Sequence, residues 1–145
     1  MKKMLVGLDG SSREQGVLSA AVALARKTGA TIVLCRSVGV PHDLPPEAYA
    51  IAPQDLPKVL EKVARTGLER LAQNVPGDLL GGVRVLIGTP WQSLERVAQE
   101  EDVDLIVIGS HGHSALDRVL GTTAAKVVNH ADRAVLVVRA PERFL

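Results

Sequence analysis

Residues 104–123 read Asp-Leu-Ile-Val-Ile-Gly-Ser-His-Gly-His-Ser-Ala-Leu-Asp-Arg-Val-Leu-Gly-Thr-Thr, and this stretch decides the fold. It begins with a run of branched aliphatic residues at 105–108, which has the length and composition of a buried strand. A loop with three glycines follows, and Thr122 or Thr123 is the residue type that begins a helix. Strand, loop and helix in this order form the repeating unit of a parallel α/β sheet.

Strands and helices also alternate along the rest of the chain, before and after this stretch. Strands are expected at residues 1–8, 31–38, 83–87, 105–108 and 134–138. Helices are expected at 11–28, at 57–74, from Pro90 and from Thr122 or Thr123. The sequence around Ser11, Ser12, Glu14 and Gln15 predicts a capping box at the first helix.

This alternation predicts one doubly wound α/β domain over residues 1–145. Its five-stranded parallel sheet should carry helices on both faces, connected by right-handed crossovers. Residues 39–56 contain Pro41, Pro45, Pro46 and Pro53, and they predict a long loop or lid between the second strand and the second helix.

Composition excludes several classes of protein. Lys and Arg total 17 and Asp and Glu total 16, so the formal charge of +1 gives no reason to expect binding to nucleic acid or to an anionic membrane. No run approaches the roughly 20 apolar residues of a membrane span, and the N-terminus lacks a signal-peptide pattern. The single cysteine, Cys35, excludes an internal disulfide and is expected to be a small buried residue of a strand. We therefore expect a cytoplasmic protein.

Two loops follow strands at the edge where open α/β sheets bind ligands, 9–12 and 109–123. The second contains Gly109, Gly112 and Gly121, can expose backbone amides, and leads into the positive end of a helix dipole, which suits a polyphosphate. The alternative is that the glycines only permit turns and that a threonine only caps the helix. Hydroxyl groups in the same loop come from Ser110, Ser114, Thr122 and Thr123.

These residues resemble the universal stress protein family, whose nucleotide-binding branch carries Gly, two residues, Gly, about nine residues, Gly and then Ser or Thr. Here eight residues separate Gly112 from Gly121. The resemblance spans nearly the whole chain. It also includes Asp9-Gly-Ser, Gly88-Thr-Pro, residues 104–112 and residues 127–138.

The resemblance implies a strand order of 3-2-1-4-5 and a bound adenine nucleotide, ATP with Mg²⁺ or alternatively ADP or AMP. Adenine would lie near the ends of the first two strands and the phosphates would lie on the glycine loop. The residues implied to bind the nucleotide are Asp9, Gly10, Ser37, Val38, Gly109, Gly112, His113, Gly121, Thr122 and Thr123. Gly109 and Gly112 would contact the ribose and α-phosphate, and the last three would contact the outer phosphates.

Several of these positions have a second interpretation. Asp9 can contact the ligand or can bond its own turn, and Ser11 and Ser12 are more typical of helix caps than of ligand contacts. His111 and His113 have no further histidine or cysteine nearby to complete a metal site, so they are expected to face ligand or solvent.

The sequence therefore predicts an ATP-binding regulatory or stress-response protein without catalytic residues, because it contains no P-loop, Rossmann fingerprint or nucleophile elbow. ATP hydrolysis should at most be slow. The alternative is a dimeric interaction protein of the same fold that binds no nucleotide. By resemblance, the homodimer should form through residues 134–138.

Overall fold

The computed structural model describes residues 1–39, 54–110 and 119–145. Most of the expected 39–56 loop, and Gly112 and His113 of the glycine loop, lie outside the described residues. The elements in chain order are β1 (Lys3–Gly7), α1 (Glu14–Thr28), β2 (Thr31–Val38), α2 (Leu56–Ala72), β3 (Leu80–Ile87), α3 (Pro90–Glu100), β4 (Leu105–Gly109), α4 (Thr122–His130), β5 (Ala134–Val138) and the 3₁₀ helix η2 (Pro141–Phe144).

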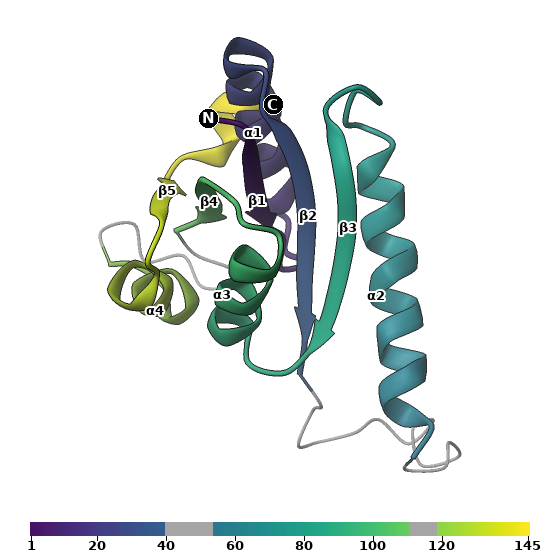
Figure 1. Ribbon diagram of the computed structural model, residues 1–145. Coiled ribbons are helices and arrows are strands. Elements are labelled where there is room, and N and C mark those ends of the chain that lie inside the picture. The colour runs from purple at the N-terminus through teal and green to yellow at the C-terminus, as the bar shows by residue number, and fades with distance from the viewer. Residues whose placement is uncertain (40–53, 111–118) are drawn as a thin grey trace.

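The strands form one parallel sheet in the order β3-β2-β1-β4-β5, as Figure 1 shows. In the middle of the sheet, Leu5 of β1 pairs with Val33 of β2 on one side and Ile106 of β4 on the other. The predicted fold class and strand order are confirmed. The order reverses between β1 and β4, because the chain first adds strands on one side of β1 and then on the other.

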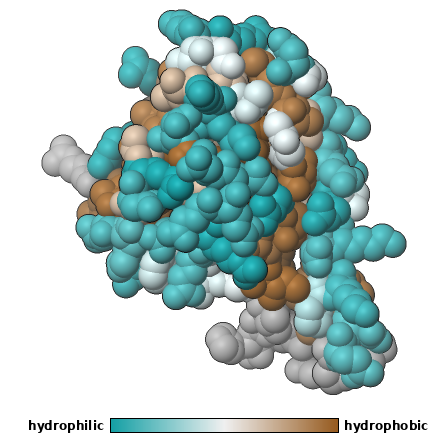
Figure 2. Space-filling view, in the orientation of Figure 1, coloured by the Kyte–Doolittle hydropathy of each residue, from teal (hydrophilic) through white to brown (hydrophobic). Residues whose placement is uncertain are grey.

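The core lies on both faces of the sheet, because successive residues of a strand point to opposite faces. Met4 and Val6 pack with α1 and α2 on one face, while Leu5 and Ile106 pack with α3 and α4 on the other. This two-sided burial explains why the strands read as unbroken apolar runs. Figure 2 shows a band of hydrophobic residues over β2 and β3, flanked by hydrophilic side chains. None of the described helices has the length and apolarity needed to cross a membrane.

Two elements begin three residues away from the expected start, and the other expected boundaries are within two residues of the observed ones. Helix α1 begins at Glu14 with Arg13 as its N-cap, because the Ser11 hydroxyl and the Glu14 carboxylate bond the preceding turn instead of capping the helix. Strand β3 begins at Leu80, three residues earlier than expected, because pairing with Ile32 of β2 holds a glycine-rich segment extended. Glycine lowers strand propensity, so the sequence pattern hid this part of the strand.

The chain ends in η2, which packs against α1 at Gly16. A Cβ atom at Gly16 would lie 2.2 Å from the Pro141 carbonyl oxygen, a distance that the backbone of η2 cannot accept without moving. Glycine within a helix costs about 0.5–1 kcal/mol relative to alanine. The close approach of η2 therefore accounts for a glycine in the first half of α1.

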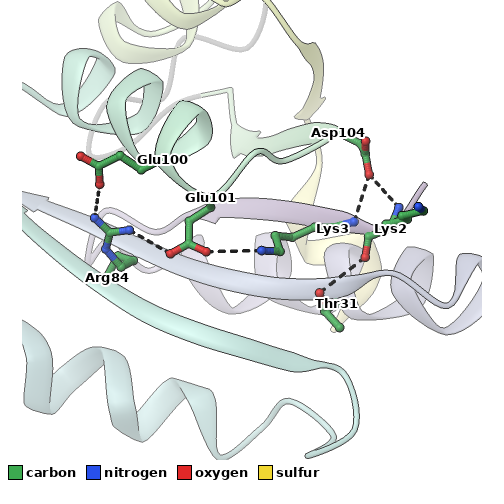
Figure 3. A network of polar contacts seen from close by, with 7 residues as sticks. All are labelled: Lys2, Lys3, Thr31, Arg84, Glu100, Glu101 and Asp104. Carbon is green, nitrogen blue, oxygen red and sulfur yellow. Dashed lines mark hydrogen bonds and ion pairs between the residues drawn. The ribbon is translucent and has the colours of Figure 1, made fainter.

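A charged network runs from the amino ends of β1 and β4 to Arg84 in the middle of β3 (Figure 3). The Asp104 carboxylate accepts hydrogen bonds from the amides of Lys2 and Lys3 at 2.7 and 3.1 Å, and these bonds lower its pKa. Glu101 accepts a hydrogen bond from Arg84 at 2.9 Å and pairs with Lys3 at 3.4 Å. The hydrogen bond from Arg84 lowers the pKa of Glu101. Charged side chains thus connect the start of β1 to the segment before β4 and to β3.

We predict that Gly16→Ala lowers the free energy of unfolding by about 1–3 kcal/mol, because the added methyl group must displace η2. Urea unfolding measures this change. Gly67→Ala is the matched control, since Gly67 also lies inside a helix but its Cβ would meet only the far end of the Arg36 side chain, at 3.2 Å. Gly16→Ala protein that is as stable as Gly67→Ala protein would contradict the packing of η2 on α1.

We predict a second effect on stability from Glu101→Gln, because the folded protein holds the pKa of Glu101 below its ordinary value. A carboxylate with a lowered pKa contributes stability above its unfolded-state pKa, and that contribution is lost as the pH falls through the folded-state pKa. The stability difference between wild type and Glu101→Gln should therefore be largest at neutral pH. It should shrink as the pH falls through the lowered pKa of Glu101 in the folded protein. Urea unfolding across this range measures it, and a pH-independent difference would contradict the charged network.

Candidate functional site

A cavity of about 440 Å³ opens at the carboxyl ends of β1 and β4, where the strand order reverses. This is the position at which open α/β sheets bind ligands, because the loops that follow the two strands turn to opposite faces. The residues that line it are Gly7, Leu8, Asp9, Ser11, Arg13, Glu14, Val17, Cys35, Ser37, Pro90, Leu94, Ile108, Gly109, Ser110, Gly121, Thr122, Thr123 and Ala124.

The inner wall of the cavity is apolar. A Cβ atom at Gly7 would lie 2.9 Å from Leu94 Cδ2 and 3.1 Å from Ile108 Cγ2, so Gly7 allows α3 to pack closely on β1. Cys35 is 1% exposed, which confirms its predicted burial on a strand. Burial raises the pKa of its thiol to about 12, although the positive charge of Arg84 opposes the shift. Cys35 therefore stays protonated and contributes an apolar surface, not a nucleophile.

The β1–α1 turn forms the second wall, and its polar groups are bonded locally. The Leu8 amide donates to the Cys35 carbonyl at 2.9 Å, and the Ser11 amide donates to Asp9 Oδ1 at 2.9 Å. Gly10 adopts φ of 79°, a left-handed conformation that favours glycine. The bonding of Asp9 to its own turn is thus present, and the same side chain also lines the cavity.

Glu14 and Arg13 line the cavity beside this turn, and sequence reasoning missed both as site residues. Glu14 Oε2 accepts a hydrogen bond from the Gly10 amide at 2.8 Å and lies 2.5 Å from Arg36 Nη2. The Glu14 and Arg36 side chains are only 16% and 14% exposed. The signal for Glu14 and Arg13 was their place directly after the first strand, next to Asp9. Glu14 was interpreted only as part of a capping pattern, and Arg13 was given no role.

The third wall comes from the ends of the glycine loop. The Ser110 amide donates to the Val138 carbonyl at 3.1 Å, and the Ser110 carbonyl accepts a hydrogen bond from the Gly121 amide at 2.7 Å. The second bond joins the residue that leaves β4 to the residue that begins α4. The two ends of the loop are therefore held together beside the cavity.

Helix α4 presents its amino end to the cavity. Gly121 is its N-cap, and no side chain among the described residues caps the helix. The first intrahelical bond runs from the Ala125 amide to the Gly121 carbonyl, so the amides of Thr122, Thr123 and Ala124 have no intrahelical acceptor. These amides and the helix dipole give this wall a partial positive charge. The wall can bind an anion.

On the side of the cavity near β2, polar groups of Ser37 and Val38 already make hydrogen bonds within the protein. The Ser37 hydroxyl lies 2.8 Å from the Gly88 carbonyl and 3.0 Å from Ser93 Oγ. The Val38 carbonyl accepts a hydrogen bond from the Gly88 amide at 2.9 Å, and Val38 is not among the lining residues. Both residues lie at the carboxyl end of β2.

The structure thus brings together most of the predicted site residues that it describes. Gly10 and Val38 lie beside the cavity without lining it. Gly112 and His113 fall outside the described residues. The predicted residues that line the cavity are Asp9, Ser37, Gly109, Gly121, Thr122 and Thr123. In the part of the chain that the structure covers, His, Cys, Asp and Glu form no cluster of three that could hold a metal ion.

Comparison of the sequence with known proteins finds one family across almost the whole chain. Residues 1–139 match the universal stress protein family. A universal stress protein of Synechocystis is 30% identical over 94% of this chain and 97% of its own. Universal stress protein A homolog 1 of Coxiella burnetii is 29% identical over 94% of this chain and 95% of its own.

Solved structures show the same likeness. Universal stress protein UspA from Lactobacillus plantarum superposes with a TM-score of 0.76, at 26% identity, over 95% of this chain and 97% of its own. A universal stress protein in complex with cAMP gives a TM-score of 0.64 at 22% identity, over 95% and 96% of the two chains. A universal stress protein from Archaeoglobus fulgidus in complex with dAMP gives 0.57 at 20% identity, over 94% and 97%.

Proposed function

The chain belongs to the universal stress protein family, and from this premise we propose that it is a regulatory protein that binds an adenine nucleotide. ATP is the proposed ligand, with ADP and AMP as alternatives. One observation carries the proposal: the cavity at the β1–β4 reversal is lined by Gly121 and by the amino end of α4, whose first amides have no intrahelical acceptor. We take residues 1–145 as a single cytoplasmic nucleotide-binding domain with a role in the stress response.

The chemistry of the cavity supports a ligand with a flat apolar part and an anionic part. Cys35, Leu94 and Ile108 offer apolar surface to a base, while the α4 amides and the Thr122 and Thr123 hydroxyls can donate to phosphate oxygens. A volume of about 440 Å³ lies within the usual range for small-molecule sites. Asp9 would contact the base or ribose.

Two structural relatives support the choice of adenine. Their ligands, cAMP and dAMP, both combine adenine with a phosphate group. Backbone groups at Ser37 and Val38 would hold the adenine, with Gly10 beside the ribose. Gly109, Gly112 and His113 would face the ribose and the first phosphate. Mg²⁺ would be held mainly through the phosphates of ATP.

We expect any hydrolysis of ATP to be slow. A general base must reach the attacking water with a free lone pair. Among the described lining residues, each carboxylate has one oxygen already engaged, Asp9 Oδ1 by its own turn and Glu14 Oε2 by Arg36. These bonds hold both side chains against the turn and leave one oxygen of each for a water. The buried thiol of Cys35 is protonated. These residues bind and position a ligand better than they activate water.

We also propose that the protein forms a homodimer through residues 134–138. Strand β5 pairs with β4 on one side and has no strand on its other side in the described sheet. Unpaired edges favour association with another chain. Leu136 is 39% exposed on this strand, close to the half-exposed Phe144. If nucleotide binding fails, this interface is the basis of the alternative function, a dimeric interaction protein.

We predict that Gly121→Val weakens ATP binding at least roughly tenfold, because a branched side chain at the N-cap of α4 would hold a phosphate away from the amides of Thr122 and Thr123. Each lost hydrogen bond to a charged group is worth about 1.5–3 kcal/mol. The Gly121 backbone has φ of −61° and ψ of 165°, which valine also adopts, so the variant should fold. Isothermal titration measures the affinity. Mass spectrometry of the nucleotide released from undialysed wild-type protein identifies the ligand carried in the cell.

The matched control for this variant is Gly77→Val. A Cβ atom at Gly77 meets nothing within 4 Å, and Gly77 does not line the cavity. This control should retain wild-type affinity. Equal affinity of Gly121→Val and Gly77→Val proteins would rule out the start of α4 as the phosphate site.

For the dimer, we predict that Leu136→Lys shifts the protein to monomers, because a charge at the centre of the interface would be buried without a partner. Sedimentation equilibrium at tens of micromolar measures the association. Val63→Lys is the control, since Val63 is also exposed but lies on α2, on the other side of the sheet order. A wild-type monomer under these conditions would contradict the proposal.

A further inference from the structure

The charges that line the cavity are at odds with an anionic ligand. Two carboxylates, Asp9 and Glu14, line it, and Arg13 is the only cation among the described lining residues. Arg13 can offset only one of the two carboxylates, and the other would repel a phosphate close to it, strongly so in a partly enclosed site where the effective dielectric constant is low. The site therefore needs a further positive charge.

Arg36 supplies that charge from behind the cavity wall. It does not line the cavity, yet its Nη2 lies 2.5 Å from Glu14 Oε2, and both side chains are largely buried. The same carboxylate oxygen accepts the Gly10 amide at 2.8 Å. Glu14 thus lines the cavity and is bonded to Arg36, which does not.

Packing fixes the position of Arg36. Its Nε lies 3.4 Å from the Leu8 carbonyl, the last backbone acceptor before Asp9. A Cβ atom at Gly67 of α2 would lie 3.2 Å from its Nη1, so helix α2 closes over the guanidinium at this glycine. The charge is therefore held in one place by α1, α2 and the β1–α1 turn.

We propose that Arg36 sets the charge of the cavity by neutralising Glu14, and that this ion pair determines how well the cavity accepts phosphate groups. The inference rests on the proposed nucleotide binding and deepens it. Arg36 is a positioning residue that acts through Glu14 and touches no ligand atom. Its effect on affinity must consequently grow with the number of phosphates.

The test measures the affinities of adenosine, AMP and ATP by isothermal titration, without magnesium, for a mutant cycle. Arg36→Met removes the cation and leaves the Glu14 carboxylate exposed to the ligand. It should weaken ATP binding roughly tenfold or more, AMP binding less, and adenosine binding by no more than about twofold. In Arg36→Met/Glu14→Gln protein neither charge remains, and the amide oxygen of the introduced glutamine still accepts the Gly10 amide. This double variant should recover most of the ATP affinity.

Two further variants distinguish an effect of the Arg36 charge on affinity from an effect on folding. Arg36→Lys keeps the positive charge and should bind ATP better than Arg36→Met protein. Arg65→Met breaks the exposed Glu61–Arg65 pair far from the cavity and should leave all three affinities unchanged. Circular dichroism of every variant confirms that it is folded before titration.

A purely structural role for Arg36 would displace the β1–α1 turn and would weaken adenosine and ATP binding equally. That result overturns the inference, and so does a double variant that binds ATP as weakly as Arg36→Met. Wild-type protein that binds none of the three ligands overturns the proposed function itself, and this outcome is distinguishable because it requires no variant.

Discussion

The site depends on one topological constraint, the reversal of strand order between β1 and β4. A parallel sheet with right-handed crossovers must place its helices on both faces, so the loops after β1 and β4 leave the sheet in opposite directions. Between them no helix can cover the strand ends. The apolar walls at Gly7 and Ile108, the β1–α1 turn and the start of α4 meet at this gap, and each is supplied by a different segment.

The two edges of the sheet use polar groups differently. At the amino edge, Asp104 accepts hydrogen bonds from the backbone at the start of β1, and nearby Glu101 pairs with Lys3 and Arg84, which anchors the strands. At the carboxyl edge, the turn that contains Asp9 is satisfied internally, while the amides at the start of α4 have no intrahelical acceptor. A fixed turn that faces amides without an intrahelical acceptor is a preorganised arrangement, and preorganisation reduces the entropy that binding would otherwise cost.

Local sequence patterns predicted the strands at 31–38 and 134–138 with the observed boundaries, because their aliphatic runs are uninterrupted. The strand order came from family resemblance, since periodicity cannot say which strands are neighbours. Gly81 and Gly82 hid the start of β3, where pairing with β2 outweighs weak propensity. Arg36 could not be found as part of the site. Arg36 lies 22 residues from Glu14 in the chain, and the two side chains meet only when β2 is folded beside α1.

The hydrogen bond between the Ser110 carbonyl and the Gly121 amide, at 2.7 Å, has a consequence for evolution. It fixes the two ends of the glycine loop whatever lies between them. The entropy of closing a loop changes only slowly with its length, so gaining or losing one residue alters stability by only about 0.1 kcal/mol. Loop length is therefore nearly free to drift across a lineage while the helix start stays in place. The spacing of eight residues between Gly112 and Gly121 is one such permitted variation, and selection can tune loop contents separately from the frame that holds them.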